Sequence, residues 1–124
     1  MGIYTGLRGT ITLNDEYADK IRDVMVTDSL FFWRHVLPPG HPFLDKDRCD
    51  SIPYGAVCYM PGDWEDGHAW LNGNEWQICC SLKNYSDEIA TFVETVLPLI
   101  AKSWDLESLY EEADYPDVHI GSAD

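Results

Sequence analysis

The sequence predicts an α+β domain in which an antiparallel sheet of about four strands packs one face against two main helices and precedes an acidic C-terminal element. Strand-like alternation and helix-like spacing occur in the order strand, helix, loop, three strands, helix and tail. The 124 residues fall within the size range of one domain, so residues 1–124 are expected to form a single compact unit. The apolar fraction of 45%, with five Trp, seven Tyr and four Phe, predicts a folded chain rather than a disordered acidic one.

The first half of the chain contains one strand pattern, one helix pattern and a long loop. Residues 4–13 alternate apolar and polar side chains, which is typical of a half-buried strand. Asn14 then provides an N-cap for a helix over residues 15–26, whose apolar residues recur at helical spacing. The apolar block 30–37 favours a short helix. Residues 38–53 contain four prolines and predict a long irregular loop.

The middle of the chain predicts an antiparallel meander. Residues 54–60, 68–71 and 75–83 favour strands, and Asn72-Gly73-Asn74 is a strong hairpin signal between the second and third of them. On the third strand the face that carries Trp76 is the more apolar, so we expect that face to meet the helices.

A second helix is predicted to begin at Ser86, which is followed by acidic residues and by an apolar stripe that continues to Ile100. Pro98 lacks the N–H that a helix interior needs, so the helix is expected to kink or end there. For residues 104–112 the composition favours a helix, and a strand at the sheet edge is the alternative left open.

Charge is the most informative feature of the composition. The chain holds 22 acidic and eight basic residues, a formal net charge of −14, and no Lys or Arg follows Lys102. This balance argues against direct binding to nucleic acid or to anionic membranes, because phosphate contacts need clustered cations. We therefore expect a basic protein surface as the partner. Seven carboxylates lie in the last 22 residues: Asp105, Glu107, Glu111, Glu112, Asp114, Asp117 and Asp124.

Two acidic segments that also carry aromatic residues are the candidate contact sites. One is the loop around Trp64, and the other is the C-terminal stretch, in which aromatic side chains can anchor a partner that the carboxylates attract. A solubilising role for the tail is the alternative. The predicted partner-binding residues are Asp63, Trp64, Glu65, Asp66, Glu107, Tyr110, Glu111, Glu112, Asp114, Tyr115 and Asp117.

No residue pattern indicates an enzyme, a cofactor or a bound metal. The chain has no Gly-x-Ser-x-Gly motif, and the acidic loop near Trp64 lacks the spacing of a calcium-binding EF-hand. The four cysteines, Cys49, Cys58, Cys79 and Cys80, include no C-x-x-C pair and are expected to be reduced thiols. The N-terminus lacks the pattern of a secretion signal, so a cytoplasmic location is expected.

In composition the chain resembles the small acidic proteins with which phages and mobile elements block nucleic-acid-binding defence enzymes such as restriction and CRISPR effectors. The resemblance implies a non-catalytic inhibitor that mimics nucleic acid, of the anti-CRISPR or anti-restriction type. One alternative is an immunity protein for a nuclease toxin. A second, from a different class, is a small enzyme or ligand-binding domain with residues 38–53 as its lid. Self-association is left open.

Overall fold

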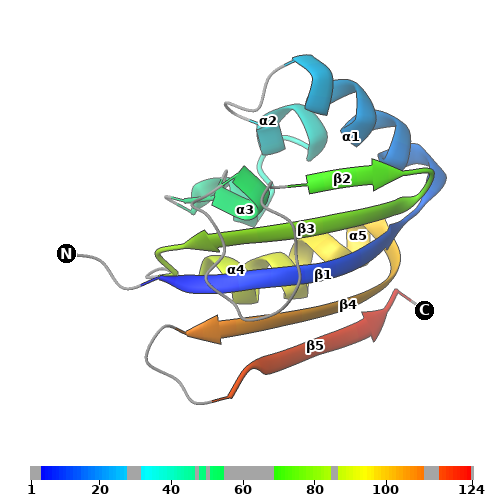
Figure 1. Cartoon of the computed structure of the whole chain (residues 1–124). Helices are drawn as coiled ribbons and strands as arrows, with labels where there is room; N and C mark the ends of the chain where they lie inside the picture. The colour runs from blue at the N-terminus through cyan, green and yellow to red at the C-terminus, as the bar shows by residue number, and fades with distance from the viewer. Residues whose placement is uncertain are drawn as a thin grey trace.

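The computed structural model describes residues 4–27, 32–46, 48–49, 51–54, 69–84, 87–110 and 115–123. It is a mixed α/β structure with one antiparallel sheet of five strands in the order β2-β3-β1-β4-β5 (Figure 1). In chain order the elements are β1 (Thr5–Leu13), α1 (Asp15–Thr27), α2 (Phe32–Val36), the 3-10 helix η1 (Pro42–Asp45), α3 (Ser51–Tyr54), β2 (Ala69–Asn72), β3 (Glu75–Leu82), α4 (Glu88–Thr91), the π-helical turn η2 (Phe92–Val96), α5 (Leu97–Ile100), β4 (Ala101–Tyr110) and β5 (Asp117–Ser122).

The first strand and the first helix confirm the sequence prediction. β1 is the central strand and pairs with both β3 and β4. Its odd-numbered residues are buried, with Leu7 and Ile11 fully so, whereas Arg8 and Thr10 project to the other face. Asn14 caps α1, because its side-chain Oδ1 accepts a hydrogen bond from the Tyr17 N–H at 3.0 Å.

The predicted hairpin is also present. Asn72 of β2 pairs with Glu75 of β3, and Gly73 in the turn between them has φ = 62°, which glycine adopts without strain. The Arg22 guanidinium donates to the Gly73 carbonyl at 3.0 Å and so ties α1 to this turn. The strand expected over residues 54–60 is not observed at Tyr54, which ends α3, and the rest of that range lies outside the described residues.

The second predicted helix is divided into three parts. α4 passes into the wide turn η2, in which the Leu97 N–H bonds to the Phe92 carbonyl five residues earlier, and α5 follows. The wide turn fits a sequence in which Pro98 offers no N–H to the carbonyl of Glu94. Ser86, the expected cap, lies outside the described residues. In the described part of the chain, the Ile89 N–H donates a hydrogen bond to the Asn84 Oδ1 at 2.9 Å.

The favoured helix over residues 104–112 is wrong for the part that the structure describes, because β4 extends through Tyr110. Trp104, Leu106 and Ser108 alternate on one face of β4 and pair with β1, and this cross-strand burial outweighs local helix propensity. β4 is an interior strand, and the edge position belongs to β5, which the sequence analysis did not predict. Residues 101–110 and 117–122 are therefore strands of the sheet, and the described part of the chain gives no support for a separate acidic C-terminal element.

Buried aromatic side chains join the helical segments to the sheet. The Trp33 ring on α2 lies 5.9 Å from the Trp76 ring on β3 and 5.5 Å from the Phe92 ring on η2. Phe43 of η1 and Ile52 of α3 are fully buried in the same cluster, and the Trp33 indole N–H donates to the Ile52 carbonyl. The Trp76 face of β3 thus contacts helical residues, and part of the 38–53 segment belongs to the core. In Figure 1, α4 and α5 lie behind β3 and β1.

The cysteines follow the strand alternation. Cys80 is fully buried in the core cluster, while the adjacent Cys79 projects to the opposite face, where it is also buried. Cys49 is buried as well, and Cys58 lies outside the described residues. In the described parts of the chain, no helix combines the length and the apolar character that crossing a membrane requires.

Candidate partner-binding face

The strand register builds a row of side chains across the whole sheet, on the face opposite the aromatic core. Trp70 on β2 pairs with Gln77 on β3, Gln77 with Thr10 on β1, Thr10 with Asp105 on β4, and Asp105 with Ile120 on β5. Paired residues project to the same side of a sheet. We call this side the outer face. The five positions span about 19 Å at a strand spacing of about 4.8 Å.

This row is apolar at both ends and polar in the middle. Ile120 is 69% exposed and Trp70 is 36% exposed, while Gln77 and Asp105 between them are also exposed. Among the described residues no salt bridge joins Asp105 to a cation. A carboxylate and a large apolar side chain are therefore both accessible within one strand spacing at the β4–β5 end of the face. Charged attraction flanked by apolar contact area is the arrangement expected of a protein-binding surface.

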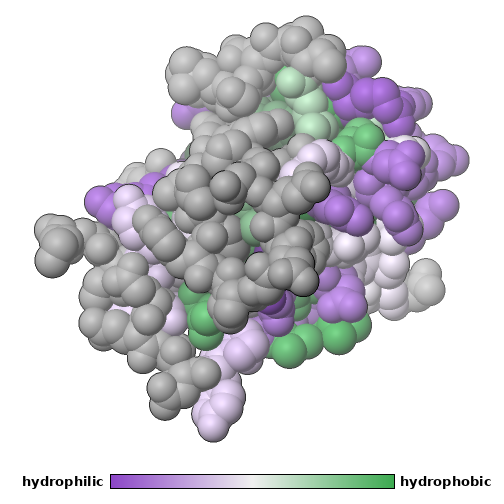
Figure 2. Space-filling view, viewed as in Figure 1, coloured by the Kyte–Doolittle hydropathy of each residue, from purple (hydrophilic) through white to green (hydrophobic). Residues whose placement is uncertain are grey.

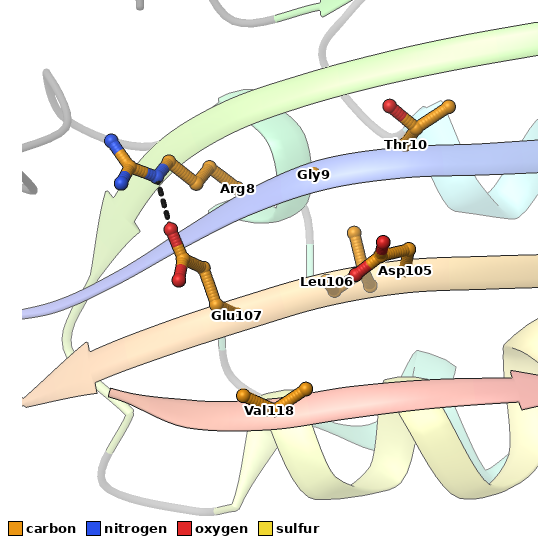
Figure 3. Close-up of a pocket in the computed structure, with 7 residues that line it drawn as sticks. All are labelled: Arg8, Gly9, Thr10, Asp105, Leu106, Glu107 and Val118. Atoms are coloured by element: carbon orange, nitrogen blue, oxygen red, sulfur yellow. Dashed lines mark hydrogen bonds and ion pairs between the residues drawn. The ribbon is translucent and has the colours of Figure 1, made fainter. Parts of the chain in front are cut away.

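A second row lies beside the first and contains the charged pair of the outer face. Arg8 on β1 pairs with Glu107 on β4, and Glu107 pairs with Val118 on β5. The Arg8 Nε lies 2.6 Å from the Glu107 Oε1, and the two side chains are 11% and 32% exposed (Figure 3). Because Glu107 offsets the charge of Arg8, this ion pair does not neutralise Asp105. Val118 is 63% exposed and extends the apolar border that Ile120 begins.

A shallow hollow of about 200 Å³ lies between these two rows (Figure 3). Gly9 lines it with backbone only, and β1 and β4 approach closely there, since a Cβ at Gly9 would lie 2.2 Å from the Asp105 carbonyl oxygen. The Asp105 carboxylate and apolar atoms border this space beside the Arg8–Glu107 pair. A carboxylate next to apolar surface suits the charged head and the aliphatic stem of a Lys or Arg side chain. The lining residues are Arg8, Gly9, Thr10, Asp105, Leu106, Glu107 and Val118.

The structure separates the described members of the predicted site. Glu107 lies on the outer face, but Tyr110 pairs with Thr5 and Asp117 pairs with Ser108, so both project to the opposite side. Tyr110 is 44% exposed and Asp117 is exposed there. Tyr115, just before β5, is 82% exposed. The predicted residues of the C-terminal region are therefore divided between the two faces of the sheet.

Seven predicted site residues lie outside the described residues. Four belong to the loop around Trp64, and the other three fall in the connection between the end of β4 and the start of β5. Their contribution stays a prediction. These residues are Asp63, Trp64, Glu65, Asp66, Glu111, Glu112 and Asp114.

The candidate face adds Asp105, Val118 and Ile120 to the predicted residues; Asp105 already lay in the acidic region that the sequence singled out, whereas Val118 and Ile120 did not. A signal was present, because Val118 and Ile120 are β-branched residues two positions apart, which is typical of a strand. Trp70 was not among the predicted residues either, since only the pairing of all five strands places it in one row with Asp105.

The histidines in the described ranges do not line this hollow. Both ring nitrogens of His41 contact backbone groups: Nδ1 accepts from the Phe43 N–H at 3.1 Å, and Nε2 lies 3.2 Å from the Thr95 carbonyl. His35 is exposed on α2. His41 thus serves as a cap for η1, which is a structural role.

One Ser–His contact joins β4 and β5. The Ser108 Oγ lies 2.8 Å from the His119 Nε2, and Ser108 is 6% exposed. Ser108 lies inside β4 with Leu7 paired on one side and Asp117 on the other, so the surrounding backbone donates within the sheet. The sharp turn with free backbone donors that stabilises an oxyanion does not occur at this position.

No protein-family model, curated protein or solved structure matches this chain. Within the described ranges, His, Cys, Asp and Glu side chains do not gather in groups of three or more that could hold a metal ion.

Proposed function

We propose that this chain is a non-catalytic, acidic cytoplasmic protein that inhibits a basic, nucleic-acid-binding partner protein, and that it binds through the outer face over β4 and β5. One observation carries the proposal. The register places exposed Asp105 directly between the hollow above Gly9 and exposed Ile120. A partner that docks on this face would therefore contact the Asp105 carboxylate, the hollow and the apolar Ile120 side chain at the same time.

The whole-chain charge supports the same conclusion. A formal net charge of −14 attracts a basic surface at long range, and this attraction accelerates encounter more than it adds affinity. Exposed apolar side chains such as Val118 and Ile120 supply contacts that slow dissociation. A partner that normally holds nucleic acid offers the cationic surface that this combination fits.

The experiment begins with affinity capture of partners and continues with the purified partner. Association rates are measured at low salt for the wild type and for an Asp105→Asn/Glu107→Gln variant, in which the introduced glutamine keeps an acceptor for Arg8. The matched control is Glu16→Gln/Glu94→Gln, which removes equal charge from exposed positions on α1 and η2.

We expect the outer-face variant to associate roughly 3–10 times more slowly, with a smaller loss at about 0.15 M salt, where the Debye length is about 8 Å. The control variant should retain most of the wild-type rate. Equal losses in both variants would mean that only net charge matters, and no loss in either would remove the outer face from the proposal. Displacement of nucleic acid from the partner by the wild type tests the inhibitory role.

The two alternatives predict different outcomes. For an immunity protein, the captured partner is a nuclease that the chain inactivates. For the enzyme or ligand-binding alternative, residues 38–53 would open as a lid, yet Phe43 and Ile52 in that segment are fully buried. Opening would remove both side chains from the core, so this observation does not favour the lid.

A further inference from the structure

The sheet ends at β5, and one backbone hydrogen bond defines which groups of β5 point away from β4. The Ala123 N–H donates to the Lys102 carbonyl at 3.0 Å. Antiparallel partners alternate between hydrogen-bonded and non-hydrogen-bonded pairs. Applied to the β4–β5 register, this alternation directs the N–H and C=O groups of Asp117, His119 and Gly121 toward β4.

The backbone groups of Val118, Ile120 and Ser122 therefore point outward from the sheet edge. In the described part of the chain no strand lies beyond β5 (Figure 1). The side chains of Val118 and Ile120 are 63% and 69% exposed on the outer face, and Figure 2 shows apolar surface along the lower edge, where β5 runs in Figure 1. Val118 and Ile120 thus offer apolar contact area together with backbone groups that no described strand pairs with. Such an edge is a template for another strand.

We infer that β5 binds an extended segment of a basic partner by strand addition, and that this segment alternates apolar residues with Lys or Arg. This inference rests on the proposed function and names the kind of segment that is bound. On the outer face, apolar residues of the added strand would lie beside Val118 and Ile120. On the opposite side its cations would lie near exposed Asp117, which projects to that side.

The net negative charge of the chain favours a basic segment over a second copy of this chain as the strand that pairs with β5. A second copy of this chain would bring a second net charge of −14 against the first, and like charges resist association. A segment bearing Lys or Arg is attracted instead, and backbone hydrogen bonds then hold it in register. Strand addition gains affinity from the main chain and specificity from alternate side chains.

The probe is a synthetic peptide of about seven alternating Lys and Val residues, long enough to cover the six residues of β5. A control peptide carries N-methyl groups on alternate residues. This change keeps the charge and the apolar area of the peptide but removes the backbone N–H groups along one of its edges, so that this edge cannot donate hydrogen bonds to β5. Amide hydrogen exchange is measured by NMR on the full chain. We expect the first peptide to slow exchange at Val118, Ile120 and Ser122 by about tenfold or more. The N–H groups that already bond to β4 should change little.

Three outcomes would overturn the inference. Equal binding of the N-methylated peptide would show that the edge hydrogen bonds are not used. Unchanged exchange at Val118 and Ile120 under saturating peptide would show that the peptide binds elsewhere. Protection that rises with protein concentration without peptide would show that a second copy occupies the edge.

Two variants at one position separate backbone pairing from apolar contact. Ile120→Pro removes an outward N–H that β4 does not use, a position at which edge strands tolerate proline. Ile120→Thr keeps that N–H and loses apolar area. We expect Ile120→Pro to weaken peptide binding about tenfold more than Ile120→Thr, and equal weakening would contradict strand addition.

The same measurements distinguish this inference from the proposed function. If Asp105→Asn/Glu107→Gln slows association with the captured partner while Ile120→Pro does not weaken it, acidic binding stands and strand addition fails. If Ile120→Pro weakens binding while Asp105→Asn/Glu107→Gln does not slow association, the electrostatic part of the proposed function fails, and strand addition at β5 stands.

Discussion

Replacement of Gly9 by Ala tests the close approach of β1 and β4 on which the outer face depends. Gly9 has φ = 146°, a conformation that L side chains rarely adopt. A Cβ at this position would lie 2.2 Å from the Asp105 carbonyl oxygen and 2.7 Å from the Leu106 Cα. Both contacts are with backbone, so β1 and β4 would have to separate by roughly 1 Å to reach ordinary contact distance.

Two costs add at this position. Overpacking in a close-packed site costs about 1–3 kcal/mol, and a backbone conformation that is almost restricted to glycine costs about 1–3 kcal/mol. We therefore expect Gly9→Ala to lower the free energy of unfolding by roughly 4 kcal/mol. Gly40→Ala is the control, because Gly40 has φ = 84° but its Cβ would meet nothing within 4 Å. That variant should lose only about 1–2 kcal/mol, the cost of the backbone conformation.

Urea titration followed by tryptophan fluorescence measures both variants. Their m-values should match the wild type, because the surface exposed on unfolding is unchanged. A loss of roughly 4 kcal/mol lowers the midpoint of thermal unfolding by more than about 8 °C in a domain of this size. If Gly9→Ala were no more destabilising than Gly40→Ala, β1 and β4 would not approach as closely as described, and this reasoning would be refuted.

Three further predictions concern the C-terminal hairpin and the loop around Trp64. Gly121→Ala should lower the free energy of unfolding by about 1–3 kcal/mol, because its Cβ would lie 2.7 Å from the indole ring of Trp104, which pairs with Gly121. An unchanged free energy of unfolding would contradict the position of that ring. Replacing Glu111, Glu112 and Asp114 by Gln, Gln and Asn should keep the fold and slow association with the partner at low salt, an effect that shrinks at about 0.15 M salt. An unchanged association rate at low salt would leave those charges a solubilising role. Trp64→Ala should weaken partner binding by about 2 kcal/mol or more, and a stability loss of about 3–5 kcal/mol would instead make Trp64 a core residue.

The elements that local chemistry specifies were predictable from the sequence. The cap at Asn14 and the Gly73 turn depend on neighbouring residues, and the structure confirms both. Pro98 likewise marked an interruption of the second helix. In each case the deciding interaction lies within a few residues along the chain.

The C-terminal region was harder to predict because its conformation depends on a distant strand. Leu106 and Tyr110 at helical spacing favoured a helix, but they pair with Gly9 and Thr5 of β1, which lie near the other end of the chain. The row from Trp70 to Ile120 exists only once all five strands are in register. Composition could place the candidate site in the acidic C-terminal region, but only the register could divide that region between two faces.

The most direct test of the proposed contact surface is a residue-resolved NMR titration of the ¹⁵N-labelled chain with the captured partner. We expect the largest shift changes at Asp105, Glu107, Val118 and Ile120, with the exposed residues of α1 little affected. Changes concentrated on α1 and η2, with β4 and β5 unaffected, would contradict binding through the outer face.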